Sequence, residues 1–205
     1  MRLRHYYHVY TGAPGWEAIV DEHLDVLAHN DLCYETDAVR LGVVGPDGSM
    51  DEVARRFLDK GVPVTVVAKE LAGWEQVTLK VLYDELEDDT AVLYTHTKGA
   101  TSPSDLHTAW RRSMTKLLVE EWFTCKQMLE RVEVVGCHWL TPERFADVGT
   151  PYFGGNFWWA RADYLRTLAP PGEESRHAAE AWVGSGPPKM VADRSPGWPG
   201  WASFK

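Results

Sequence analysis

Between residues 5 and 135 the chain alternates short apolar runs with longer amphipathic segments. The short runs are rich in Val, Leu and Tyr, as is typical of buried strands, and lie at 5–10, 41–44, 62–67, 91–94 and 132–135. In the longer segments apolar residues recur at helical spacing, and these segments lie at 16–30, 51–60, 74–86 and 104–131. This alternation predicts an α/β fold with a mostly parallel central sheet flanked by helices.

The pattern weakens beyond residue 141. Residues 156–168 are expected to form a strand or loop that enters a short helix at about 162–168. From residue 183 onward Gly, Pro and Trp dominate, which is typical of an irregular tail with aromatic anchors. A chain of 205 residues suits one domain with a full core better than two domains. We therefore expect 1–205 to form a single domain, with 185–205 irregular.

The net charge of −9 narrows the range of partners. A charge of this sign repels phosphate backbones at long range, and local basic pairs such as Arg111-Arg112 offset it little. Nucleic acid is therefore a disfavoured partner, although a local basic pocket would still suit a single nucleotide. Hydrophobic residues at 44% and charged residues at 25% are ordinary for a folded protein.

The cysteines and the N-terminus favour a cytoplasmic protein. Cys33, Cys125 and Cys137 are widely spaced, form no CxxC pair and leave one over, which argues against a disulfide framework. The residues after Met1 are polar and aromatic, so we see no signal peptide. No apolar run approaches the ~20 residues that cross a bilayer. We expect membrane contact, if any, to be peripheral.

The exits of the predicted strands nominate a ligand site. In an open α/β sheet ligands bind at the carboxyl ends of the strands, where the loops diverge. The fourth exit, His96-Thr97-Lys98-Gly99, carries the most chemistry. Lys98 would neutralise a diphosphate, and Gly99 would let the backbone approach the phosphates closely. The alternative is a solvated lysine in a connecting loop.

Other chemistries lack their characteristic sequences. The chain has no Walker sequence, no GxGxxG and no GxSxG between a strand and a helix, which argues against P-loop hydrolysis, dinucleotide redox chemistry and serine hydrolysis. His96 and His138 with Cys137 would suit a divalent metal, yet histidines on separate strand exits are more often structural or substrate contacts. The acidic segment 84–89 precedes the fourth strand, and we interpret it as a solvated helix end at the opposite edge of the sheet.

Two segments carry a resemblance to a known family. At His96–Gly99 and at Gly155-Asn156-Phe157-Trp158-Trp159-Ala160 the chain resembles GT-A-type glycosyltransferases and glycosyltransferase-like proteins of bacteria and their phages. Glu180-Ala181-Trp182-Val183-Gly184 is similar to the closing element of the same pattern. The similarity extends from the first strand to about residue 184. The two motifs together are fairly specific, whereas either alone is not.

The resemblance implies a Rossmann-like GT-A fold that binds a nucleoside-diphosphate sugar across the strand exits. Residues 1–140 would be the nucleotide-sugar-binding half and 141–184 the acceptor-side half. The implied donor contacts are Thr11 and Gly12 at the nucleoside and His96, Thr97, Lys98 and Gly99 at the diphosphate. The implied sugar and acceptor contacts are Gly155, Asn156, Trp158, Trp159 and His138. Adjacent residues on a strand face opposite sides, so at most one of the two tryptophans would line the site, and core packing is the alternative for both.

Metal dependence is open at this point. Many related enzymes end the fourth strand in an Asp-x-Asp that holds a divalent cation, but here the position reads His96-Thr97-Lys98. Mn²⁺ or Mg²⁺ thus stays an unassigned cofactor, and Lys98 would supply part of the missing positive charge. An inverting transfer also needs a carboxylate base near the acceptor hydroxyl. Glu180 is the first candidate and Asp163 the second, with a plain surface carboxylate as the alternative for each.

Three functions remain for the structure to weigh. The first is a glycosyltransferase that uses the residues above and transfers a sugar to an acceptor hydroxyl on a glycan, a protein, a small molecule or a modified base of phage DNA. The second is a non-catalytic module that binds nucleotide sugars or carbohydrates. The third is a metal-dependent hydrolase that uses His96, Cys137 and His138.

Overall fold

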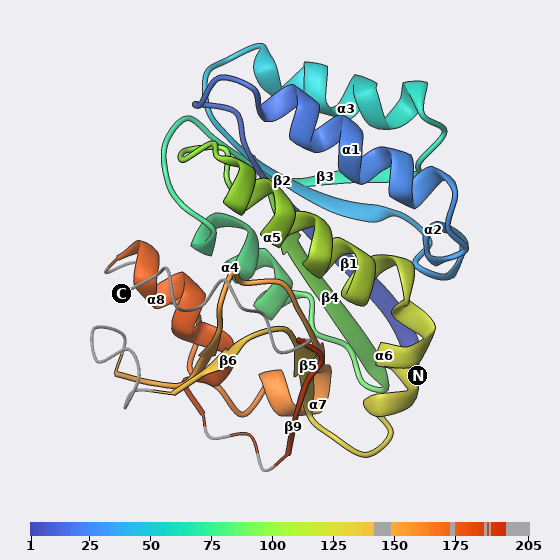
Figure 1. Cartoon of the computed structure of the whole chain (residues 1–205), viewed down its shortest axis with the longest axis vertical. Coiled ribbons are helices and arrows are strands. Elements are labelled where there is room, and N and C mark those ends of the chain that lie inside the picture. The colour runs from blue at the N-terminus through green and yellow to red at the C-terminus, as the bar shows by residue number, and fades with distance from the viewer. Residues whose placement is uncertain (142–148, 173–174, 187, 189, 196–205) are drawn as a thin grey trace.

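The structure, a computed structural model of the chain, describes residues 1–141, 149–172, 175–186, 188 and 190–195. Among these residues a seven-stranded sheet has the order β3-β2-β1-β4-β8-β5-β9 (Figure 1). Its strands are β1 (Arg2–Tyr10), β2 (Val39–Val44), β3 (Val64–Glu70), β4 (Thr90–His96), β5 (Val134–Gly136), β8 (Trp158–Arg161) and β9 (Val191–Asp193). Neighbouring strands are parallel except at β8, which is antiparallel to both β4 and β5. A separate two-stranded ribbon pairs β6 (Trp139–Leu140) with β7 (Tyr152–Phe153).

Helices cover both faces of the sheet. They are α1 (Trp16–Ala28), α2 (Leu32–Glu35), α3 (Ser49–Asp59), α4 (Gln76–Asp84), α5 (Asp105–Thr115), the π-helical η1 (Lys116–Glu120), α6 (Trp122–Met128), α7 (Ala162–Leu165), α8 (Arg176–Ala181) and the 3₁₀ turn η2 (Trp182–Gly184). The side chains of α1, α3, α5 and α6 fill one core, and those of α4, α7 and α8 fill the other. Strand β1 separates the two cores by simple alternation, because Tyr7 and Val9 face the first core while Tyr6 faces the second.

The predicted fold class is confirmed. Four strand–helix repeats build the parallel strands β1 to β4, as the alternating pattern indicated, and helices flank the sheet on both sides (Figure 1). The chain therefore has an α/β architecture with a mostly parallel, mixed sheet. Within the part of the chain that is described, we find no helical segment with the length and apolarity that a bilayer crossing requires.

Two predicted elements differ from the structure. The single long helix expected at 104–131 is divided into α5, η1 and α6, because the hydrogen bond from Glu121 N to Lys116 O at 3.1 Å closes a wider π turn. The irregular tail expected from residue 185 contains strand β9, which pairs in parallel with β5. Three residues between glycines and prolines are too few for a sequence pattern to mark as a strand. Residues 196–205 of that tail lie outside the described residues.

The acidic segment at 84–89 is more than a solvated helix end. It lies at the edge of the sheet where β4 begins, as expected, but its carboxylates are paired. Glu85 Oε2 accepts from Arg40 Nε at 2.8 Å, and Glu87 Oε2 lies 2.8 Å from Arg2 Nη1. The segment therefore ties the amino ends of β1 and β2 to the turn before β4.

Candidate functional site

The carboxyl ends of β1, β2, β3 and β4 surround a cavity of about 790 Å³. Its walls come from four segments that are far apart in sequence: the exits of β1 and β2, the loop from β3 to α4, and the turn after β4. The lining residues are His8, Tyr10, Gly12, Gly45, Pro46, Leu71, Ala72, Gly73, Trp74, Glu75, Gln76, His96, Thr97, Gly99, Ala100 and Thr101. A volume of this size is typical of pockets that hold small molecules and cofactors.

A buried Glu75–His96 pair lies at the wall of this cavity. His96 Nδ1 is 3.3 Å from Glu75 Oε1, and His96 Nε2 is 2.8 Å from the carbonyl oxygen of Gly155. A carbonyl oxygen only accepts, so Nε2 carries a proton. An ionised Glu75 also only accepts, so Nδ1 then carries one as well. The geometry therefore suits an imidazolium beside a carboxylate, a pair with no net charge.

The reversed strand β8 explains why Gly155 reaches His96. Because β8 is antiparallel to β4, its first residue, Trp158, pairs with Tyr94 near the carboxyl end of β4. The residues just before Trp158 therefore arrive at the ligand edge of the sheet. Gly155 has a φ of 90°, and a Cβ on it would lie 2.7 Å from Met114 Sδ, so this position requires glycine.

Lys98 points away from the cavity. Its Nζ lies 4.4 Å from the ring centroid of Trp110, a cation–π distance, and its carbonyl oxygen accepts from Arg111 Nη1 at 3.1 Å. Its side chain is absent from the described lining, whereas His96, Thr97 and Gly99 of the same turn are present. Trp110 also lies 3.2 Å from the position of a Cβ on Gly155, so it separates Lys98 from the Gly155 turn. This arrangement is at odds with direct contact between Lys98 and a ligand in the cavity.

Of the other residues expected to contact the sugar donor, some line the cavity and others hold its wall in place. Gly12 lines the cavity. Thr11 does not, because its Oγ1 is 2.6 Å from Ser49 Oγ and bonds the chain leaving β1 to the start of α3. Thr97 Oγ1 accepts from Tyr10 N at 3.0 Å and joins the exits of β1 and β4. The structure thus brings Gly12, His96, Thr97 and Gly99 together at one cavity.

Trp158 and Trp159 belong to the core. Trp158 stacks on Tyr94 at a centroid distance of 5.2 Å, and its Nε1 donates to Asn156 Oδ1 at 2.9 Å. Trp159 faces the opposite core and donates from Nε1 to the carbonyl oxygen of Leu118 at 2.7 Å. The predicted opposite facing is present, but neither ring is part of the cavity wall. Asn156 is fully buried as well, so its amide supports the turn rather than the wall.

The two carboxylates expected to act as base lie away from the cavity. Asp163 follows β8 at the edge where β4 begins, since Arg161 pairs with Ala91, and it is an exposed partner of Arg161. The reversed direction of β8 therefore places Asp163 at the edge of the sheet opposite the cavity. Glu180 lies on α8, which packs against α4, and it is half-buried outside the cavity lining.

His138 is buried beside Trp110 rather than in the cavity. The two rings meet edge to face at 5.9 Å, and the His138 backbone N donates to Asp193 Oδ1 at 2.9 Å. Burial lowers the pKa of His138 and raises that of Cys137. The described residues include no group of three or more His, Cys, Asp or Glu side chains placed to hold a metal ion. A hydrolase built on His96, Cys137 and His138 therefore lacks a metal cluster in this part of the chain.

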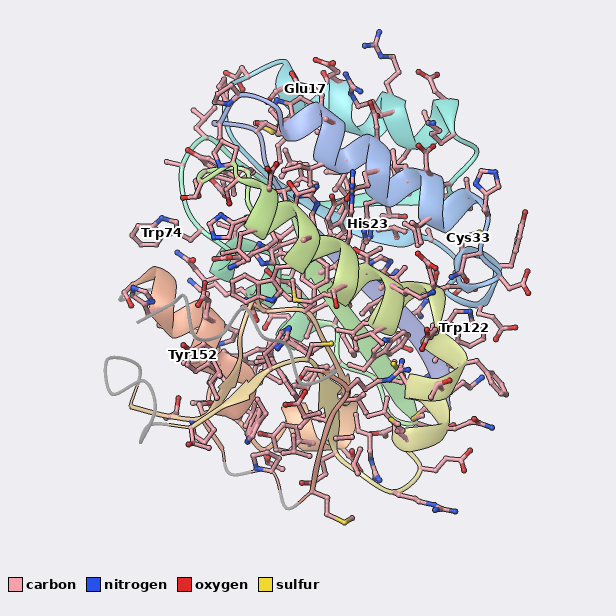
Figure 2. The ribbon with its side chains drawn as sticks, viewed as in Figure 1. Glu17, His23, Cys33, Trp74, Trp122 and Tyr152 are labelled. Atoms are coloured by element: carbon pink, nitrogen blue, oxygen red, sulfur yellow. The ribbon has the colours of Figure 1, made fainter. Side chains whose placement is uncertain are left out.

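Sequence reasoning missed the wall that the β3–α4 loop supplies. Trp74 is about half exposed and lies at the periphery of the molecule in Figure 2, while Glu75 and Gln76 are buried and line the cavity. Gln76 Oε1 is buried and has no hydrogen-bond partner among the described residues. A signal was present, since a Trp-Glu-Gln sequence follows Gly73 at a strand exit, but the expected strand ended at residue 67 and the observed one ends at Glu70.

His8 adds a second buried imidazole to the cavity wall. Its Nδ1 lies 2.8 Å from Thr78 Oγ1, which ties β1 to α4. Burial lowers the pKa of His8 to about 4, with the charge of Glu75 acting in the opposite direction. His8 is therefore neutral at pH 7. Among the described residues, no Lys or Arg side chain lines the cavity.

Comparison with known proteins gives a family and a fold. The model of the family described as "Domain of unknown function (DUF8361)" matches residues 6–174. A search of the curated proteins gives no significant match.

Three solved structures show the range of structural similarity. S. aureus TarS 1-349 has 11% identity and a TM-score of 0.53, with 94% of this chain and 58% of that chain covered. The mannosyltransferase PcManGT from Pyrobaculum calidifontis, solved with GDP-Man and Mn²⁺, has 18% identity and a TM-score of 0.46, with 100% and 60% covered. The 4-diphosphocytidyl-2C-methyl-D-erythritol synthase from Anaerococcus prevotii DSM 20548 has 9% identity and a TM-score of 0.44, with 80% and 74% covered. The chain thus spans about 60% of the first two proteins, and the similarity to TarS concerns the fold alone.

Proposed function

The chain belongs to the DUF8361 family, and we propose that it transfers a sugar from a nucleoside-diphosphate sugar to an acceptor hydroxyl. The cavity at the carboxyl ends of β1 to β4 is the observation that carries this proposal. It lies where open α/β sheets bind ligands, and its volume of about 790 Å³ accommodates an activated sugar. The turn at His96–Gly99, which resembles that of GT-A-type glycosyltransferases, forms part of its wall.

The wall suggests how the donor would lie. Gly12 and Gly45, at the exits of β1 and β2, line the part of the cavity where the nucleoside would lie, and Trp74 offers an aromatic face at the mouth. Thr97 and Gly99 would then lie beside the diphosphate. Lys98 is assigned to support of the turn through Trp110, because its side chain points away from the cavity.

The charge of the diphosphate sets a condition on this function. The described residues place neither a Lys or Arg side chain on the cavity wall nor a metal-binding cluster in the molecule, so they do not fit a resident divalent cation. We therefore assign no step to a metal. The same observation favours a second candidate function, a module that binds the sugar nucleotide or a carbohydrate without transfer.

A binding and turnover experiment tests the proposal. Calorimetry against a panel of nucleoside-diphosphate sugars, with and without Mn²⁺, should find a donor, and release of the nucleoside diphosphate should follow in the presence of an acceptor or of water. Trp74→Ala should weaken donor binding about ten-fold if the ring stacks on the ligand. Binding without release of the diphosphate would support the non-catalytic binding module. Absence of any binding would overturn both functions.

Phe123→Ala is the matched control for this variant. Phe123 is an exposed aromatic residue like Trp74, and it neighbours Trp122, which lies across the molecule from Trp74 in Figure 2. Its truncation should leave donor binding unchanged. An equal loss of binding in both variants would show that the loss does not depend on a contact in the cavity, and it would contradict the placement of the donor.

A further inference from the structure

We propose that Glu75 is the general base of the transfer and that His96 is the residue that positions it. This inference rests on the proposed function and identifies the proton acceptor within the same cavity. It replaces Glu180 and Asp163, which lie outside the described cavity wall.

Glu75 is the one carboxylate among the described residues that line the cavity. It is 5% exposed, so the protein surrounds it on almost every side while it still reaches the cavity. A base must touch the hydroxyl that it deprotonates, and a carboxylate at any other described position would have to act from outside the cavity.

The backbone holds Glu75 in one place. Its carbonyl oxygen accepts from Thr78 N at 3.1 Å and from Leu79 N at 3.0 Å, which closes the first turn of α4. The side chain thus sits at the amino end of a nine-residue helix, where the helix dipole favours a negative charge. Both features keep the carboxylate fixed in one place and favour a negative charge on it.

His96 holds the carboxylate from the other side. Its Nδ1 faces Glu75 Oε1 at 3.3 Å, and its Nε2 is anchored to the Gly155 carbonyl at 2.8 Å. Three separate elements, α4, β4 and the turn before β8, therefore meet in one chain of polar groups. Because both ring nitrogens are directed at protein oxygens, His96 has a positioning role and does not itself reach the substrate.

The charge of this pair suits an anionic donor. A lone carboxylate in a cavity without a described Lys or Arg would repel a diphosphate, whereas the Glu75–His96 pair is neutral as a whole. The other titratable groups that face Glu75 are His8 from β1 and Tyr94 from β4, and Glu180 of α8 acts on the same Tyr94 hydroxyl. His8 and Tyr94 are both neutral at pH 7, so His96 is the group that balances Glu75.

The reaction balances with these groups. The acceptor oxygen forms a bond to C1 of the donor sugar while the bond from C1 to the phosphate oxygen breaks, and the electron pair of that bond leaves with the nucleoside diphosphate. The proton of the acceptor hydroxyl passes to Glu75, for which we assign Oε2, since Oε1 faces His96. The proton then leaves to solvent through the cavity. The configuration at C1 is inverted, because one displacement occurs.

The test compares binding with turnover in the full chain. Glu75→Gln keeps the shape of the side chain but cannot accept the proton, so we expect kcat for diphosphate release to fall at least ~100-fold while donor Kd changes less than ~3-fold. Glu130→Gln, at an exposed glutamate beyond α6, is the control and should leave both quantities unchanged. Glu75→Asp, which keeps the carboxylate, should recover part of kcat and covers the case in which Glu75→Gln fails to fold.

His96→Asn separates positioning from simple structural support. We expect a smaller loss of kcat than in Glu75→Gln, together with a shift in the acidic limb of the pH–rate profile, because the balancing charge is gone. Turnover in Glu75→Gln within ~3-fold of the wild type would overturn the base while leaving the transferase intact. Failure of the wild-type chain to bind any donor would instead overturn the proposed function itself.

Discussion

Two motifs of similar prominence in the sequence have different roles in the molecule. The turn at His96–Gly99 lies at the end of a parallel strand and contributes three residues to the wall of the cavity. The segment 155–160 runs into the reversed strand β8 and contributes two tryptophans to the two cores. The difference shows that a conspicuous aromatic motif beside a cavity can support its wall from behind, while a less conspicuous loop, at Trp74–Gln76, forms the wall itself.

Truncation of a buried tryptophan tests this difference most directly. Trp159→Ala should lower the free energy of unfolding by ~3–5 kcal/mol, because it leaves a large cavity and removes the donor to the Leu118 carbonyl. Urea unfolding monitored by circular dichroism measures the loss. If the variant kept wild-type stability but lost ligand binding, Trp159 would have to be a binding residue rather than a core residue.

Acid sensitivity should appear in both regions. Burial lowers the pKa of His8, at the cavity, and of His23, on the buried face of α1, from 6.5 to about 4. Both residues bind protons more readily when the chain is unfolded, so stability is full above pH 6.5 and falls as the pH drops toward 4. Each should cost about 1.4 kcal/mol per pH unit in that window.

Urea titrations at several pH values check this prediction residue by residue. His23→Gln should remove about half of the slope attributed to the two histidines. His29→Gln, at an exposed position of the same region, should leave the slope unchanged. A slope that survives replacement of both His8 and His23 would assign the acid sensitivity to other groups.

A comparison of two glycines tests whether steric crowding, in addition to the positive φ, makes glycine necessary at the turn behind the cavity wall. Gly155 and Gly15 have φ values of 90° and 83°, but a Cβ at Gly155 meets Met114 and Trp110 whereas a Cβ at Gly15 meets nothing within 4 Å. Gly155→Ala should therefore destabilise the protein by ~1–3 kcal/mol more than Gly15→Ala does. Equal losses in thermal or urea unfolding would show that Met114 and Trp110 move aside without cost.

The smallest effect on stability should come from Trp74→Ala. The side chain is 47% exposed and packs on no core, so its removal should change the free energy of unfolding by less than ~0.5 kcal/mol. The same urea series that measures Trp159→Ala provides this value. A loss of unfolding free energy above ~2 kcal/mol would show that Trp74 stabilises the fold. Trp74 would then no longer differ in role from the buried tryptophans.

The sequence was sufficient for the fold and for part of the cavity wall. Strand–helix alternation predicts β1 to β4, and the rule that ligands bind at strand exits then finds Gly12, His96, Thr97 and Gly99. These inferences succeed because they depend on local periodicity and on the shared direction of parallel strands.

The positions that the sequence did not predict depend on contacts between distant segments. The direction of the Lys98 side chain is set by Trp110 on another helix, and the location of Asp163 is set by the reversal of β8. Glu75 was not among the residues expected at the cavity, because no spacing along the chain connects it to His96 and Gly155. Side-chain direction at a turn and the polarity of an inserted strand are tertiary properties.

The reversal of β8 also makes the two ends of this short strand unequal as sites for engineering. Its four residues span about 13 Å, so extra residues added before Trp158 would lie at the edge of the sheet that carries the cavity, and extra residues added after Arg161 would lie at the opposite edge. Loop grafts intended to alter the rim of the cavity belong on the first side. Tags, linkers or fused partners belong on the second, where a longer connection leaves the cavity as it is.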